Sequence, residues 1–200
     1  MLLSTAYLPP ISYFRSLQTT DVVTIEKYEH FVKQTLRNRC HILSPNGIQT
    51  LIVPISHDHR QRAAIKDIRI ANDQPWQRQH WRSMCAAYQR SAFFEFYQDD
   101  LAPFYERSYE FLMDLNMDLL SFLIEQLKLK QTFNYTSEYH HPSPELIDDF
   151  RILSDAGSAD PSAMIKSYPQ VFGYKAGFVP GLSIIDLLFN MGPATENYIS

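Results

Sequence analysis

The 200-residue sequence contains only two cysteines, Cys40 and Cys85, and six glycines. The cysteines lie in segments typical of a strand and a helix, where cysteine commonly acts as a small buried apolar residue, so we expect no structural disulfide. The sequence has no glycine-rich P-loop, no Gly-x-Ser-x-Gly elbow and no dinucleotide-binding fingerprint. These absences argue against a kinase, an α/β-hydrolase and a Rossmann dehydrogenase, but not against a transferase that positions two substrates with its side chains.

A surplus of positive charge and a long apolar run are also missing. The formal net charge is -4, whereas a nucleic-acid-binding surface requires clustered lysine and arginine, so we expect no nucleic-acid partner. No window approaches the ~18 consecutive apolar residues of a membrane span, and the first residues lack the basic and apolar pattern of a secretion signal. The sequence therefore predicts a cytoplasmic protein without a membrane span.

The remaining composition is that of an ordinary globular protein. Hydrophobic residues make up 45% of the chain, aromatic residues 14% and charged residues 20%. A chain of this length buries ~70% of the surface that it exposes when unfolded. We expect one domain over residues 1–200, with a core rich in phenylalanine and tyrosine, that folds without a metal or a disulfide.

The first half of the chain is dominated by strand patterns. The strongest is Asn46-Gly47 between two β-rich runs, which predicts a hairpin over residues 39–55 because both residues tolerate positive φ. Other β-branched or apolar runs, together with a proline stop at positions 9 and 10, predict strands at 2–8, 21–26 and 65–70 and a helical turn at 11–17.

From Pro75 onward the spacing of apolar residues becomes helical. It predicts one helix after residue 75, a corner at 93–97, a long helix over about 101–129, a strand at 133–136 and helices at 145–154 and 183–190. Ser183 is the expected N-cap of the last helix, with Asp186 three residues later completing a capping arrangement. The fold class expected is α+β: a small mixed or antiparallel sheet, with the hairpin at 39–55, packed against a mainly helical C-terminal half.

Three stretches are typical of one family: YLPPISYF at 7–14, KQTLRNR at 33–39 and GFVPGLSIIDLLFNMGP at 177–193. On these residues, together with 66–70 and 76–81, the chain resembles the WbqC-like family over essentially its whole length. The resemblance implies a bacterial cytoplasmic protein whose gene often lies among genes for surface-polysaccharide or O-antigen synthesis. It also implies an enzyme that modifies sugar intermediates, and it identifies no cofactor.

Basic residues precede the predicted hairpin. If that stretch is extended, alternation places Lys33, Arg37 and Arg39 on a shared side. With Asn38 they would form an anion clamp for the phosphate of a nucleotide-sugar or of a phosphorylated acyl carrier, because arginine binds phosphate bidentately and lysine binds it as a point charge. The alternative is a set of surface charges at a strand end. The resemblance favours the binding role for Lys33, Asn38 and Arg39.

A second group of candidates centres on His80. Spacing places Trp76 and His80 on one face of the predicted helix, and a partly buried histidine at a pocket edge could act as a general base. The alternative is a helix histidine hydrogen-bonded within the core. Tyr7 and Tyr13, with Trp76, could offer flat surfaces to a sugar ring, although packing is the commoner use of aromatic side chains.

Asp186 and Asn190 lie four residues apart on the last predicted helix and so project from one face. Asp186 could hold Lys33 or Arg39 in a buried ion pair that orients the site. It could equally be a carboxylate of the first turn that stabilises the helix dipole.

His57 and His59 have the spacing at which two imidazoles on one face of a strand can share a metal ion, although solvated loop histidines are the simpler interpretation. Three functional hypotheses follow. The first is a transferase acting on an amino sugar or a nucleotide-linked sugar, with Lys33 and His80 at the reaction centre. The second is a non-catalytic protein that binds a sugar intermediate or a partner. The third is a metal-dependent hydrolase that uses the two histidines.

Overall fold

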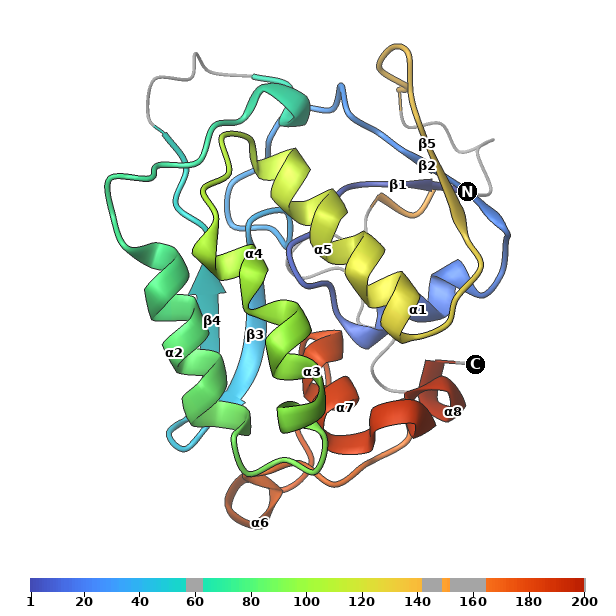
Figure 1. The fold of residues 1–200 in the computed structure, drawn as a ribbon. Coiled ribbons are helices and arrows are strands. Elements are labelled where there is room, and N and C mark those ends of the chain that lie inside the picture. The colour runs from blue at the N-terminus through green and yellow to red at the C-terminus, as the bar shows by residue number, and fades with distance from the viewer. Residues whose placement is uncertain (57–62, 142–148, 152–164, 200) are drawn as a thin grey trace.

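The structure is a computed structural model that describes residues 1–56, 63–141, 149–151 and 165–199 (Figure 1). Its strands are β1 (Leu2–Leu3), β2 (Val22–Ile25), β3 (Arg39–Ser44), β4 (Gly47–Ile52) and β5 (Thr132–Tyr135). Its α-helices are α1 (Ile11–Leu17), α2 (Trp76–Tyr88), α3 (Phe94–Leu101), α4 (Pro103–Glu106), α5 (Leu112–Gln126), α6 (Gly173–Ala176), α7 (Ile184–Met191) and α8 (Glu196–Ile199). Two 3-10 helices, η1 (Ile65–Asp67) and η4 (Gly192–Thr195), complete the described elements. The α+β class is confirmed.

The first sheet is parallel and has the order β1-β2-β5. Strand β2 occupies its centre, with Leu2 paired to Thr24 on one side and Ile25 paired to Tyr135 on the other. Residues of β2 and β5 alternate across the pleat, so that Val23 and Ile25 are buried while Val22 is half exposed. The carboxyl ends of all three strands therefore lie at one edge of this sheet.

The second sheet is the predicted hairpin, which is confirmed. Strands β3 and β4 pair antiparallel from Arg39 opposite Ile52 to Ser44 opposite Gly47. Gly47 has φ +102, a conformation that only glycine adopts without strain, and it lets the chain reverse after a two-residue loop. Tertiary contacts join α2 to β3, and Gln49 Nε2 of β4 donates to the Ser83 hydroxyl of α2 at 3.0 Å, so α2 packs against the hairpin.

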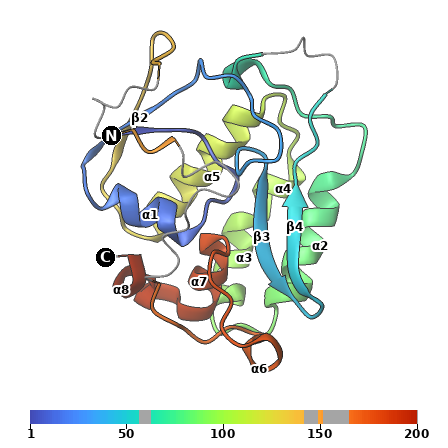
Figure 2. The same cartoon turned by 180° about the vertical axis from the view of Figure 1, so that it is seen from behind.

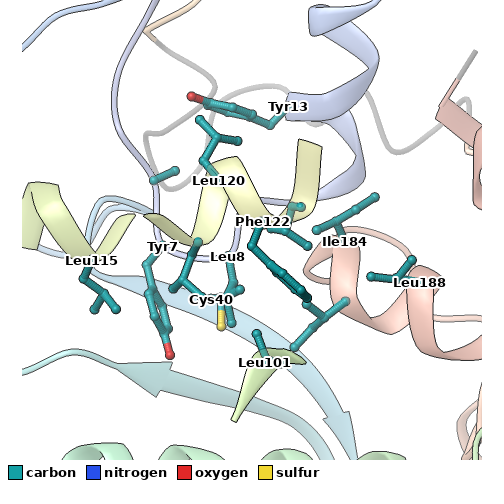
Figure 3. Packing of buried hydrophobic residues seen from close by; sticks show 14 of the residues in the cluster. Tyr7, Leu8, Tyr13, Cys40, Leu101, Leu115, Leu120, Phe122, Ile184 and Leu188 are labelled. Atoms are coloured by element: carbon teal, nitrogen blue, oxygen red, sulfur yellow. The ribbon is translucent and has the colours of Figure 1, made fainter. Parts of the chain in front are cut away.

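Helix α5 forms the centre of the hydrophobic core. In both views it runs diagonally, with the parallel sheet on one side and α2, α3 and α4 on the other (Figures 1 and 2). Its buried residues include Leu115, Leu120 and Phe122, which pack near Tyr7 and Ile184 from the two ends of the chain (Figure 3). Helices α7 and α8 contact α1, so the N-terminal and C-terminal segments are part of one core.

Several expected boundaries are wrong. The long helix over 101–129 is interrupted, because Pro103 starts a separate short helix and Arg107 is extended, with φ -87 and ψ 149. The corner at 93–97 belongs mostly to α3. The strand at 65–70 is instead η1 followed by isolated bridges from Arg69 and Ile70, and the strand at 2–8 ends at Leu3.

The other sequence expectations for secondary structure have mixed outcomes. The helical turn at 11–17, the strand at 21–26 and the strand at 133–136 are confirmed by α1, β2 and β5. Most of the helix expected at 145–154 lies outside the described residues. No helix in the described ranges combines the length and apolar character needed to cross a membrane.

Candidate functional site

The three stretches of the sequence that were singled out meet through backbone hydrogen bonds. The Tyr7 N–H donates to the Leu36 carbonyl at 2.9 Å, which joins the N-terminal proline turn to the 33–39 stretch. The Ile184 N–H donates to the Pro9 carbonyl at 2.9 Å, so the start of α7 is bound to the same turn. The turn therefore lies between segments that come from positions far apart in the chain.

The turn itself is strained. Leu8 has φ +43 although it is a bulky, fully buried residue, and left-handed backbone at such a residue is rare. Strain of this kind costs of order 1–3 kcal/mol, and it persists only where the surrounding structure imposes it. The strained residue directly follows Tyr7, whose side chain is fully buried.

A chain of hydrogen bonds links Tyr7 to two other elements. Its hydroxyl lies 2.9 Å from His80 Nδ1 on α2 and 2.8 Å from the Tyr105 hydroxyl on α4. Burial lowers the pKa of His80 to about 4, while an interaction with the Ile52 backbone acts to raise the pKa. The imidazole is therefore neutral at pH 7. With the ring proton on Nε2, Nδ1 is the acceptor for the Tyr7 hydroxyl.

Trp76 closes this group on one side. Its ring packs edge-on against His80, with the ring centroids 5.2 Å apart, and the spacing that placed both residues on one face of α2 is confirmed. Cys40 lies close enough to Tyr7 and Tyr105 to raise the pKa of both hydroxyls, after the larger effect of burial (Figure 3). The result is a closed aromatic group with a proton-accepting imidazole, defined here as the Tyr7–His80 group: Tyr7, Cys40, Trp76, His80 and Tyr105.

A second buried polar group lies at the carboxyl edge of the parallel sheet. Arg37 Nε and Nη2 donate to the two carboxylate oxygens of Glu29 at 2.9 and 2.8 Å, and Nη2 also donates to the Ser4 hydroxyl at 2.9 Å. The Ser4 hydroxyl in turn donates to Glu29 at 2.9 Å. All three side chains are buried, so the ion pair is removed from solvent screening. Arg37 is thus used to hold the fold together.

Beside this ion pair lie polar atoms that have no hydrogen-bond partner within the described residues: Thr5 Oγ1, Asn38 Oδ1 and Asn116 Oδ1. The amide groups of the two asparagines are used, because Asn38 donates to the Val53 carbonyl at 2.9 Å and Asn116 to the Arg37 carbonyl at 2.8 Å. More than nine in ten buried polar groups in proteins are paired. These three buried atoms are exceptions to that rule.

The 33–39 stretch does not form the expected extended clamp. Residues 33–38 are turns, with Gln34 at φ +63, and they place Lys33 in solvent and Arg37 in the interior. The expectation that these two side chains share a face is wrong. Arg39 begins β3 and is partly buried, and its Nε has no hydrogen-bond partner within the described residues.

Asp186 lies in the first turn of α7, which is the second of its two expected settings. Its carboxylate also accepts from the Tyr168 hydroxyl at 2.7 Å and from Gln170 Nε2 at 3.0 Å. Burial raises its pKa, against these hydrogen bonds. No ion pair joins it to Lys33 or Arg39 in the described part of the chain.

The predicted N-cap of α7 is confirmed, because the Ser183 hydroxyl accepts from the Ile185 N–H at 3.5 Å. The capping arrangement with Asp186 is wrong, because the Ser183 N–H donates to the His41 carbonyl instead, at 2.8 Å. Asn190 donates to the Asp186 carbonyl at 2.7 Å and so bonds back to its own helix.

The structure thus brings Tyr7, Trp76 and His80 together and holds the other candidates elsewhere. Tyr13 is buried and donates to the Ser4 carbonyl at 3.0 Å. Sequence reasoning missed Glu29, Asn116 and Tyr105. No local pattern marked any of the three, because each bonds to a partner that is distant in the sequence.

Two open hollows of about 650 and 560 Å³ occur on the described surface, and no candidate from the sequence lines either of them.

His57 and His59 lie outside the described residues. Within the residues that are described, no group of three or more histidine, cysteine or acidic side chains could hold a metal ion. Cys40 and Cys85 are free thiols.

Comparison with known proteins gives two matches. The model of the WbqC-like protein family matches residues 5–158 and 159–198. A protein of Mycobacterium tuberculosis, named Uncharacterized protein Rv1507c, is 27% identical over 217 residues, covering 96% of this chain and 94% of the relative. No solved structure matches the sequence.

Proposed function

This chain belongs to the WbqC-like protein family, and we propose that it is a cytoplasmic transferase of bacterial surface-polysaccharide (O-antigen) biosynthesis. Its substrate would be an amino sugar or a nucleotide-linked sugar, and a nucleotide-sugar or a phosphorylated acyl carrier would be the donor. The proposal takes its reaction class from the family resemblance, which implies an enzyme that modifies sugar intermediates. The geometry adds a proton acceptor at the junction of the three family-typical stretches.

The observation that carries this proposal is the Tyr7–His80 group. His80 is neutral at pH 7 because burial lowers its pKa to about 4, and it is joined to Tyr7 by a hydrogen bond of 2.9 Å. Strained backbone at the adjacent Leu8, with φ +43, is the kind of feature that gathers at functional sites. In the proposal, the substrate group that accepts the transferred unit loses a proton, and the hydrogen-bonded Tyr7 and His80 take up this proton.

Anionic parts of the substrate would be bound by Lys33, Asn38 and Arg39. Lys33 is exposed and free to reach a phosphate, and Arg39 has an unpartnered Nε among the described residues. Asn38 offers an unpaired carbonyl oxygen to a hydroxyl or amide donor. In the proposal these groups, which come from one short stretch of chain, contact one ligand.

The binding part of the proposal is tested with Lys33→Ala and Arg39→Ala. Each should abolish binding of UDP- or dTDP-sugars in calorimetry while the melting temperature stays within a few degrees, because neither side chain has a buried ion-pair partner among the described residues. Lys130→Ala, at another exposed lysine, is the matched control. Unchanged binding in both variants would remove the anion-binding role.

The catalytic part is tested by a mass-spectrometric turnover screen with His80→Asn and Tyr7→Phe. Both should eliminate product formation while the nucleotide-sugar still binds, since neither residue is proposed to contact the phosphates. Turnover at the wild-type rate in both variants would show that the Tyr7–His80 group is a structural element of the core.

A non-catalytic protein that binds a sugar intermediate or a partner is the second candidate. It is favoured by the closed state of the Tyr7–His80 group, because Tyr7, Trp76 and His80 are each no more than 5% exposed. It predicts ligand binding by the wild-type protein with no product in the same screen.

A further inference from the structure

The larger hollow lies apart from every candidate discussed so far. Its volume is about 650 Å³, within the usual range for a small-ligand site. One wall is formed by α5 and the segment before it. The hollow is also lined by Lys27, just after β2, and by Tyr135, the last residue of β5. The hollow therefore opens beside the carboxyl ends of two parallel strands, which is where parallel sheets characteristically bind ligands.

The walls offer an aromatic ring and charges of both signs. The Tyr135 side chain is 49% exposed, and the Lys27 ammonium lies 5.9 Å from the centroid of its ring. Two of the acidic side chains are occupied, because Asp118 pairs with Arg107 and Glu110 pairs with Arg69. The floor is apolar, since Met113 and Met117 are buried beneath the hollow.

Asp114 is the acidic side chain of this hollow that forms no ion pair within the described ranges. Its pKa is raised, first by partial burial and then by the negative charges of Asp118 and Glu110. A cation arriving beside Asp114 would pair with this carboxylate and favour its charged form. The Tyr135 hydroxyl lies in the same negative field, because Asp114 and Asp118 raise its pKa after burial does.

We propose that this hollow binds a saccharide unit that carries a free amino group, with the ring against Tyr135 and the ammonium at Asp114. Aromatic side chains present an apolar face that suits the C–H face of a sugar ring. A carboxylate and the Lys27 ammonium supply an acceptor and a donor for hydroxyl groups. This inference deepens the proposed function by naming the amino-sugar subsite, and its test requires no turnover.

The test measures binding of three free sugars by saturation-transfer NMR titration: glucosamine, N-acetylglucosamine and glucose. Wild-type protein should prefer glucosamine about two- to fivefold over the two neutral sugars, the range expected for one partly exposed ion pair. Asp114→Asn should abolish this preference and leave glucose binding unchanged. Tyr135→Leu should weaken all three sugars together.

Asp73→Asn, at an exposed acid outside the hollow, is the matched control and should behave as wild type. Putrescine is a further probe, because a site for any amine would bind it as well as glucosamine does. Equal affinity for the three sugars, no binding of glucosamine at several tens of millimolar, equal binding of putrescine, or an unchanged preference in Asp114→Asn would each overturn the proposal. If His80→Asn loses turnover but keeps the preference for glucosamine, the amino-sugar site in the hollow acts independently of the Tyr7–His80 group.

Discussion

The wild-type protein should lose stability as the pH falls from 6.5 to 4, and replacing His80 with asparagine should remove a large part of this loss. The pKa of His80 falls from 6.5 to about 4 in the folded state because burial disfavours the charged ring. The unfolded chain therefore takes up a proton at a pH where the folded protein does not. The stabilising contribution is complete above pH 6.5 and is lost as the pH falls through the folded-state pKa.

The magnitude follows from the same difference. A tenfold change in proton affinity is worth about 1.4 kcal/mol, so a pKa lowered from 6.5 to about 4 corresponds to about 3 kcal/mol over the full range. For a chain of this length that is roughly 6–12 °C in melting temperature. Asparagine does not titrate here, but its side-chain oxygen can still accept from Tyr7.

The assay is urea unfolding of wild type and His80→Asn at half-unit steps between pH 4 and pH 7.5. The smaller side chain lowers the free energy of unfolding by a similar amount at each pH, so the difference in slope isolates the titration of the ring. Tyr7→Phe is the control, because it removes the hydrogen bond and keeps the imidazole buried. Identical slopes for wild type and His80→Asn would refute the reasoning.

Three further changes test the packing. Glu29→Gln leaves the Arg37 guanidinium buried without its carboxylate and should lower the free energy of unfolding by about 3–5 kcal/mol in urea titrations. Adding Arg37→Met should recover at least half of the loss. No recovery in the double variant would contradict this. Gly192→Ala should cost about 2–4 kcal/mol, because φ is +54 and the new Cβ would lie 2.5 Å from the Phe93 ring; an unchanged melting temperature would show that the ring moves freely. The Asp186→Asn variant should melt at or above the wild-type temperature at pH 7. Burial raises the Asp186 pKa, so the stability that the protonated carboxyl contributes is lost as the pH rises through the folded-state pKa. A drop of many degrees would show that the ionised form is required.

Local patterns predicted the elements that depend on local physics. The hairpin follows from a glycine at Gly47 that can adopt positive φ, and α7 follows from an apolar helical repeat with an N-cap at Ser183. The parallel sheet was not predicted, because β2 and β5 are about a hundred residues apart and neither carries a signal for its partner. The long helix failed at Pro103, where the apolar repeat continues through a break in the backbone.

The same division applies to the candidate site. Trp76 and His80 were placed together by their spacing on one helix, whereas Tyr105 reaches Tyr7 across 98 positions and could not be seen locally. The shared face expected for Lys33 and Arg37 depended on an extended backbone that the turns at 33–38 do not provide.

The bond between the proline turn and the start of α7 has a consequence for how the protein is made. The Pro9 carbonyl accepts from the Ile184 N–H, so this bond forms only after Ile184 has been synthesised. Likewise, β1 pairs with β2 through Leu2 and Thr24, and β2 pairs with β5 through Thr24 and Asn134. A ribosome must therefore release nearly the whole polypeptide before its first segment can be enclosed. Such distant pairings slow folding and leave apolar surface open meanwhile. A nascent chain stalled before α7 would consequently be a natural client for chaperones.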